Sequence, residues 1–352
     1  MKNSPLVSFC IATYKRPTFL KTTIKSILKQ KYDNYEIIIC EDDSDMNAES
    51  VIKSFKSKKI IYQKNKKKLG MTKSYNLAIS LANGKFITLL ADDDPPTENM
   101  LKIFMDAYKK YPNEKAFWGA SYVKITSEKI EKVTHLTRGL HSLENKNKPS
   151  SSIELLNSHD FFIKFFRQEI FPHYQWTACV IAKEILQKIN KVPDYNSAHF
   201  IDYAYILKIA AKTKFVIINK AMAIVELHVL SYGKKQDTLS EYKRGVIGFH
   251  KIASPLATQL NCKKDYQQFL SNYIIMFLIN RLEHYRAHNY KINVNQLFKV
   301  YTDLCKKLSF LQQRKLELYF KLTIYYRYKF VYHTINFLRT TYGQIKIKLN
   351  HT

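Results

Sequence analysis

Residues 86–96 of the chain read Phe-Ile-Thr-Leu-Leu-Ala-Asp-Asp-Asp-Pro-Pro. The apolar run from Phe86 to Leu90 predicts a short strand that is buried on both faces. Three carboxylates follow at its carboxyl end, which is where open α/β sheets place their ligands. Adjacent carboxylates repel one another, and a divalent cation such as Mg²⁺ or Mn²⁺ would remove that conflict because hard ions take oxygen ligands. A solvated acidic turn is the simpler alternative, so the neighbouring segments decide between the two.

The segments before this strand alternate between strand and helix. Helices are predicted from Pro17 and over 72–82, and strands over 6–13, 35–40 and 60–62. Strands that alternate with single helices across short loops predict a parallel sheet with helices on its faces.

A second acidic cluster, Glu41 to Asp45, follows the strand at 35–40. Because the carboxyl ends of parallel strands meet at one edge of a sheet, both clusters should open on the same edge and form one site. Glycine-based nucleotide motifs do not explain this site: residues 12–17 replace a G-x-G-x-x-G, and no G-x-x-x-x-G-K-[ST] occurs. With only eight glycines, phosphate binding through carboxylates and a metal fits the sequence better than a backbone cradle.

The composition describes a chain with an ample core and a strong positive charge. Of the 352 residues, 46% are hydrophobic, and the formal net charge is +28. Such a charge attracts polyanions, among them nucleic acid, anionic lipid and phosphorylated substrates. The longest late apolar run, 273–279, is far shorter than the roughly 20 residues that span a bilayer. The chain also has five cysteines and no C-x-x-C motif. The short apolar run and this cysteine pattern both predict a cytoplasmic protein.

Four motifs then follow one another in the first part of the chain. They are Ser8 to Tyr14, Glu36 to Ser44, Asn76 to Ala78 followed by Asn83 to Ile87, and Leu89 to Asp94. As an ordered set they resemble the family 2 glycosyltransferases. The resemblance implies a GT-A fold, which is a Rossmann-like, mostly parallel central sheet flanked by helices. It also implies a nucleotide-sugar donor, usually a UDP-sugar, with inversion at the anomeric carbon and Mn²⁺ or Mg²⁺ as cofactor. The acceptor would be a glycan or lipid-linked glycan, in bacterial surface polysaccharide, lipooligosaccharide or glycoprotein glycan synthesis.

The resemblance assigns binding roles to residues of these motifs. It implies that the nucleotide-sugar pocket is lined by Thr13, Tyr14, Glu41, Asp42, Ser44 and Asp92. It implies a metal site at Asp92 and Asp93, with His228 reaching the metal or the diphosphate from the end of a strand. The first acid of the full D-x-D-D pattern falls on Leu90, which leaves open which of Asp92, Asp93 and Asp94 binds the metal.

The resemblance also implies a catalytic base. The family places it in a Glu-Asp pair at the start of a helix, and here Ile201 and Asp202 occupy those positions. Asp202 is therefore the expected general base. By itself, an Asp in a first helical turn only complements the helix dipole, and His228 could equally be a surface histidine. Leu90 and Ile201 also leave an inactive, donor-binding relative as an alternative.

The remaining chain is predicted in outline. We expect a GT-A domain over 1–240, with a nucleotide-sugar half over about 1–100 and an acceptor half over about 101–240. The acceptor half should contain a polar loop at 128–152, a helix from Ser158 or His159 to Phe166, and strands at 117–124, 176–181, 214–218 and 223–231.

Residues 241–352 form a basic, aromatic and helical C-terminal region. After Lys306, nine basic residues face a single acid, Glu317. Such helices suit an anionic membrane surface, or they cap the catalytic domain with a solvated basic face. The first interpretation predicts a peripheral position on the inner face of the plasma membrane.

Two other functions compete with a transferase. A sugar-nucleotide pyrophosphorylase would share the fold but calls for a glycine-rich first loop, which residues 13–17 do not supply. A non-catalytic, basic protein that binds nucleic acid or membrane would explain the charge but neither acidic strand end. We therefore expect no nucleic-acid partner.

Overall fold

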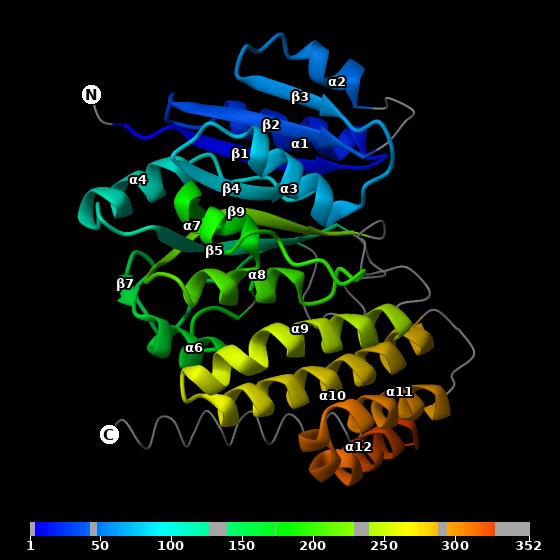
Figure 1. The fold of residues 1–352 in the computed structure, drawn as a ribbon. Helices are drawn as coiled ribbons and strands as arrows, with labels where there is room; N and C mark the ends of the chain where they lie inside the picture. Colours follow the sequence, from blue (N-terminus) through cyan, green and yellow to red (C-terminus); the bar gives the residue numbers. More distant parts are fainter. Residues whose placement is uncertain are drawn as a thin grey trace. The chain divides into compact units, whose positions relative to one another are not determined.

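The computed structural model describes residues 4–42, 48–126, 139–172, 174–228, 239–287 and 294–327 (Figure 1). The chain divides into two compact units, one reaching to Tyr266 and the other beginning at Gln267. The sheet and every described residue predicted for the site lie in the first unit. The predicted domain limit at 240 stays a prediction.

The first half of the sheet is parallel and has the strand order β3-β2-β1-β4. Its strands are almost unbroken runs of Val, Ile, Leu and Phe, as expected where both faces are covered. Proline opens the first helix with a backbone angle suited to a helix. Gly70 precedes the third helix with φ +89°, a conformation that side chains disfavour. The elements are β1 (Val7–Thr13), α1 (Pro17–Leu28), β2 (Tyr35–Glu41), α2 (Glu49–Ser54), β3 (Ile60–Lys64), α3 (Met71–Leu81) and β4 (Phe86–Ala91).

The second half continues from β4 in the order β8-β5-β9-β7, with β6 also paired to β5. Here β8 runs antiparallel to both of its neighbours, whereas β5 and β9 are parallel. The elements are α4 (Met100–Lys110), β5 (Ala116–Ile125), β6 (Gly139–Ser142), β7 (Ile153–Leu156), α6 (Ser158–Phe166), β8 (Cys179–Ala182), α7 (Lys183–Lys188), α8 (Ile201–Ala210) and β9 (Phe215–Leu227).

Four long helices follow the sheet: α9 (Leu239–Gln259), α10 (Lys263–Ala287), α11 (Val294–Lys307) and α12 (Lys315–Arg327). The predicted fold class, a mostly parallel sheet flanked by helices with a helical C-terminal region, is therefore confirmed (Figure 1). Within the described ranges, none of the helices is long and apolar enough to cross a membrane.

Three local predictions were wrong. The strand predicted at 176–181 begins only at Cys179, because Trp176 to Ala178 form a 3₁₀ turn in which the Trp176 ring packs on Tyr75. The polar loop predicted at 128–152 includes β6, which pairs with the extended end of β5; residues 127–138 lie outside the described part.

The third error concerns the strands predicted at 214–218 and 223–231, which are the single strand β9. The polar pair Asn219-Lys220 looks like a break in the sequence. Asn219 is instead buried, and its amide nitrogen donates to the carbonyls of Asn145, Lys148 and Pro149. Residues 229–231 of that prediction lie outside the described part.

Candidate active site

The carboxyl ends of β2, β1 and β4 meet at one edge of the sheet because β1 pairs in parallel with both neighbours. The Asp42 amide donates to the Thr13 carbonyl at 2.8 Å. The Thr13 hydroxyl donates in turn to Asp92 Oδ2 at 2.7 Å. The prediction that both acidic clusters open on one edge is confirmed for Glu41 and Asp42 of the cluster after β2, and Thr13 links this cluster to Asp92. Asp43 to Asp45 lie outside the described residues.

Arg16 joins the two carboxylates that follow β4. Its Nη2 lies 2.5 Å from Asp92 Oδ1, and its Nη1 donates to Asp93 Oδ2 at 2.5 Å. The Arg16 side chain is 26% exposed, whereas that of Asp92 is fully buried. One guanidinium therefore bridges two carboxylates at the rim of the sheet and compensates only part of their charge.

Burial dominates the chemistry of Asp92. It raises the pKa of this carboxyl to about 7, against the lowering effect of Arg16 and with a further rise from Asp93. The Thr13 hydroxyl and the Tyr14 backbone donate to the charged form and lower the pKa. Asp92 is thus a buried acid whose charge depends on the cation beside it.

The segment after β4 brings His228 to this pair. Residues 95–97 bond to β9, with Ile224 N donating to the Pro95 carbonyl at 2.8 Å and Thr97 N donating to the Met222 carbonyl at 2.9 Å. The end of β9 therefore passes the acidic turn, and His228 Nε2 lies 3.1 Å from Asp93 Oδ2. The Phe19 ring stacks on the His228 ring at 4.3 Å and fixes its plane.

Two further acids, Asp94 and Asp202, lie within electrostatic range of each other. Asp94 Oδ1 accepts from Glu226 N at 3.2 Å. Burial, and then the charge of Asp93, raise the pKa of Asp94 well above its usual range, and Asp202 adds to the rise. Asp202 is half-buried in the first turn of α8, and burial raises its pKa to about 6. These two carboxylates are close enough to act on each other.

Asp42 and Glu41, which are candidates for the nucleotide-sugar pocket, have hydrogen-bond partners within the protein. Asp42 is buried and accepts from Leu69 N at 2.6 Å, Gly70 N at 2.8 Å and Asn65 Nδ2 at 3.1 Å, so it shapes the loop before α3. The Glu41 carboxylate accepts from Ala48 N at 2.8 Å and from the Tyr62 hydroxyl.

The remaining candidates for the nucleotide-sugar pocket are Tyr14, which the structure describes, and Ser44, which it does not. Tyr14 is 38% exposed, and the Lys68 ammonium lies 4.2 Å from its ring centre. Its accessible aromatic face could stack on a base. Ser44 lies outside the described residues.

Sequence reasoning missed two residues of this site. Arg16 is not among the predicted site residues, although its place three residues after the end of β1, near the ligand edge of the sheet, is a signal that could have identified it. Tyr75 is fully buried, donates to the Leu90 carbonyl at 2.9 Å, and feels the charges of the Asp92–Asp94 turn and of Asp202. Its position in α3 gave no signal beyond a helical apolar face.

The site partly fits a divalent cation. In the part of the chain that the structure describes, no three His, Cys, Asp or Glu side chains surround one point. Asp93 and His228 nevertheless adjoin, and metals bound with a nucleotide take several ligands from phosphate and water. The fit requires Arg16 to leave Asp93.

The sheet, with carboxylates at the ends of its parallel strands, has the architecture of the GT-A fold. The model of the family "Glycosyl transferase family 2" matches residues 8–189, a little over half of the chain. The chain belongs to this family.

Two relatives illustrate the match. A UDP-Glc:alpha-D-GlcNAc-diphosphoundecaprenol beta-1,3-glucosyltransferase, WfgD of Escherichia coli, is 30% identical over 125 residues, which are 36% of this chain and 49% of that protein. In two further relatives, the match covers only 38% and 33% of the length of the relative. The chain therefore spans less than half the length of these three curated relatives. The GalNAc(5)-diNAcBac-PP-undecaprenol beta-1,3-glucosyltransferase of Campylobacter jejuni is 27% identical over 305 residues, covering 84% of this chain and 88% of that one.

Solved structures of S. aureus TarS 1-349 share the fold. The complex with UDP-GlcNAc has a TM-score of 0.59 at 14% identity, with 92% of each chain covered. The complex with UDP has a TM-score of 0.56 at 13% identity, with 91% of each chain covered.

Proposed function

We propose that this chain is an inverting glycosyltransferase that moves one sugar from a UDP-sugar to a hydroxyl of a lipid-linked glycan in bacterial surface or glycoprotein glycan synthesis. The observation that carries the proposal is the cluster of Asp92, Asp93 and His228 at one edge of a family 2 sheet, with Asp202 close enough for its charge to raise the pKa of Asp94. The UDP-sugar is supported by the ligands of TarS, and the lipid-linked acceptor by the names of the two glucosyltransferases.

Asp202 is the proposed general base. The acceptor oxygen attacks C1 of the donor sugar from the face opposite the diphosphate and passes its proton to the Asp202 carboxylate. A bond forms between that oxygen and C1 while the bond from C1 to the diphosphate breaks, which inverts the anomeric carbon and releases UDP. A pKa raised to about 6 leaves Asp202 ionised at neutral pH, yet more basic than an exposed Asp.

The acids at the end of β4 are the proposed donor site. Mn²⁺ or Mg²⁺ bound to Asp93 and His228, beside Asp92, would stabilise the charge that develops on the leaving diphosphate. Thr13 and Arg16 hold Asp92 in place. The exposed face of the Tyr14 ring would stack on the nucleobase of the donor. Once Arg16 is released from Asp93, its guanidinium would be a donor for phosphate oxygens.

Donor hydrolysis in the absence of acceptor tests this proposal. A panel of UDP-, GDP- and dTDP-sugars is incubated with Mn²⁺ or EDTA, using the native chain, Asp93→Asn and, as control, the exposed Asp194→Asn. We expect turnover of one UDP-sugar that EDTA and Asp93→Asn abolish and that Asp194→Asn leaves intact. No turnover, together with no metal-dependent binding of any nucleotide, would refute the donor assignment.

We also propose that the second unit docks on an anionic membrane surface, where a lipid-linked acceptor would lie. On α12, Leu316, Tyr319 and Phe320 are 83%, 59% and 63% exposed, and their spacing puts them on one helical face. Lys315 adjoins this apolar stripe, as expected of an interfacial helix.

Flotation with vesicles tests the docking. The native chain should float with phosphatidylglycerol vesicles and not with phosphatidylcholine vesicles, and Leu316→Glu/Phe320→Glu should abolish flotation. Met276→Glu, at a 48% exposed site on α10, is the matched control. Equal flotation of the double variant and the control would contradict the role of α12.

Family membership favours neither a pyrophosphorylase nor a non-catalytic basic protein. The charge of +28 is instead available for phosphorylated donors and anionic lipid.

A further inference from the structure

We propose that helix α9, which lies beyond the stretch matched by the family model, positions Asp202 by holding residues 190–200, called here the entry segment of α8. The proposal rests on the role of Asp202 in the proposed function. It makes α9 part of the acceptor half of the active site rather than of a separate C-terminal region.

The close approach of α9 to the entry segment depends on two glycines. A Cβ at Gly248 would lie 2.3 Å from Cγ of Tyr195, and a Cβ at Gly245 would lie 2.7 Å from Cβ of His199. These distances leave no room for any side chain at either position. Glycine inside a helix costs about 1 kcal/mol relative to alanine, so the two glycines trade helix stability for this contact.

Polar contacts tie the same face of α9 to the entry segment. Glu241 Oε1 accepts from Ala198 N at 3.2 Å, and Arg244 Nε donates to the Asn196 carbonyl at 3.2 Å. Together with the two glycines, these contacts span two turns of α9. The entry segment is therefore fixed along its length and not at a single point.

The last residue before α8 explains why such a support is needed. Phe200 has φ +64°, in the left-handed region that bulky side chains disfavour. A residue held there costs about 1–3 kcal/mol and persists only where its surroundings determine it. The Phe249 ring of α9 stacks on the Phe200 ring at 5.1 Å and 21°, which fixes the backbone two residues before Asp202.

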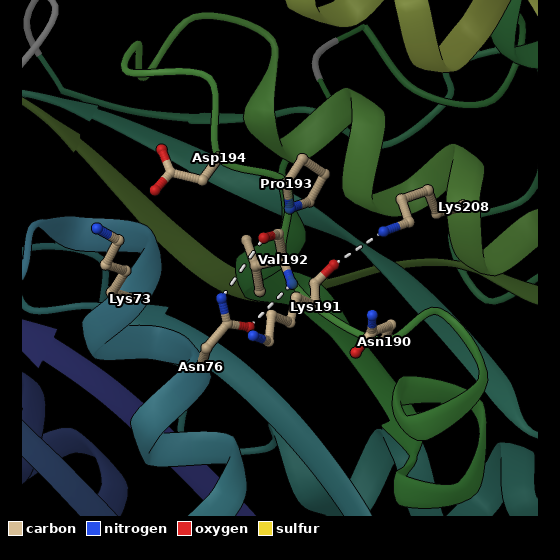
Figure 2. A pocket seen from close by; sticks show the side chains of 8 residues that line it. All are labelled: Lys73, Asn76, Asn190, Lys191, Val192, Pro193, Asp194 and Lys208. Carbon is tan, nitrogen blue, oxygen red and sulfur yellow. Dashed lines mark hydrogen bonds between the residues drawn. The ribbon is translucent and has the colours of Figure 1, made fainter.

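Helix α3 holds the other end of the entry segment (Figure 2). Asn76 Oδ1 accepts from Val192 N at 2.9 Å, and Asn76 Nδ2 donates to the Val192 carbonyl at 3.5 Å. Lys208 of α8 donates to the Lys191 carbonyl at 3.0 Å. These residues border a pocket of about 490 Å³. The entry segment is thus clamped between α3 of the donor half and α9.

The consequence is a separation of donor binding from the transfer step. Asp92, Asp93 and His228 contact Thr13, Arg16 and Phe19, and these three partners lie outside the entry segment. Displacing that segment should move Asp202 relative to the acceptor and leave the donor in place. Misplacement of a catalytic group by about 1 Å can cost a hundredfold in rate.

The test compares Gly248→Ala and Glu241→Ala with Lys251→Ala, an exposed control on α9. Transfer is measured from the UDP-sugar found in the hydrolysis panel to a synthetic diphospholipid-linked GlcNAc, and UDP affinity is measured by calorimetry. We expect kcat to fall on the order of tenfold to a hundredfold in Gly248→Ala, with donor KM and UDP affinity unchanged within about twofold. Glu241→Ala removes a tether without adding an atom, so it should fold and lower kcat in the same sense. Lys251→Ala should match the native chain.

A double-mutant cycle isolates the contact. The two shortest approaches to a Cβ at position 248 come from the Tyr195 ring, and the third, at 2.8 Å, comes from the Tyr195 Cβ. Gly248→Ala should therefore cost less in a Tyr195→Ala background, which removes the ring, and least in a Tyr195→Gly background, which removes the Cβ as well. If Gly248→Ala and Glu241→Ala keep the native kcat, or if donor KM rises as much as kcat falls, the inference is wrong. The variant Asp202→Asn distinguishes a failure of the proposed function from a failure of this inference. Retained transfer in that variant would overturn the proposed general base and this inference with it. Loss of transfer there, with native kcat in the α9 variants, would overturn the inference alone.

Discussion

Replacing Asp202 by asparagine should stabilise the first unit while it abolishes transfer. Burial raises the pKa of Asp202 from 3.8 to about 6, whereas the unfolded chain keeps an ordinary value of about 3.9. The folded state therefore holds this proton more tightly than the unfolded state. The free energy of unfolding falls as the pH rises from about 4 to about 6, and it stays reduced above that range.

The size of this effect follows from the shift. Two pKa units correspond to about 3 kcal/mol at neutral pH. Asp202 is half-buried and its ionised form also accepts a bond from its own backbone, so part of that cost is offset. We expect Asp202→Asn to raise the free energy of unfolding by about 1–3 kcal/mol at pH 7.5 and by little at pH 4.

Urea unfolding followed by tryptophan fluorescence is a suitable assay. The only two tryptophans, Trp118 and Trp176, are both buried in the first unit, so the signal reports on that unit. Asp106→Asn changes an exposed carboxylate on α4 of the first unit and should leave the unfolding midpoint unchanged. The burial argument is refuted if Asp202→Asn and the native chain have the same free energy of unfolding at pH 7.5. It is also refuted if their free energies of unfolding differ by the same amount at pH 4 and at pH 7.5.

Three further predictions concern single contacts. Arg16→Gln should strengthen Mn²⁺ binding by the nucleotide-free chain about tenfold, because it removes the cation that now neutralises Asp93; calorimetry measures this, and unchanged affinity would speak against the competition. Thr13→Val should lower the free energy of unfolding by about 1–3 kcal/mol in urea, since buried Asp92 loses its hydroxyl donor, while Thr22→Val on the surface of α1 should change it little. Asn219→Ala should cost about 2–3 kcal/mol by leaving three carbonyls short of a donor, and a cost below about 0.5 kcal/mol would show that water replaces the amide.

The parallel half of the fold could be predicted because each signal there is local. The apolar runs of β1, β2 and β4 mark their own positions, and the turns between them carry Pro17 and Gly70. The acidic ends of two of these strands then had to meet. Local sequence and parallel topology together were sufficient for that part of the site.

The acceptor half resisted prediction because its contacts join distant segments. His228 reaches Asp93 only because residues 95–97 bond to β9. The sequence around Asn219 resembles a strand break because its three carbonyl partners lie 70 to 74 residues earlier. The bridging role of Arg16 likewise depends on the spacing of β1 and β4, which no single segment specifies.

The antiparallel strand β8 has a consequence for synthesis of the chain. The parallel half ends at β4, whose outer edge is covered only when Ile181 and Ala182 pair with Ile87 and Phe86. On the ribosome, this apolar edge is made early and must wait for its partner while the residues up to Cys179 are translated. An uncovered strand of this kind invites pairing between chains. Fragments that stop before β8 should therefore aggregate, and the shortest soluble N-terminal fragment should end beyond Ala182.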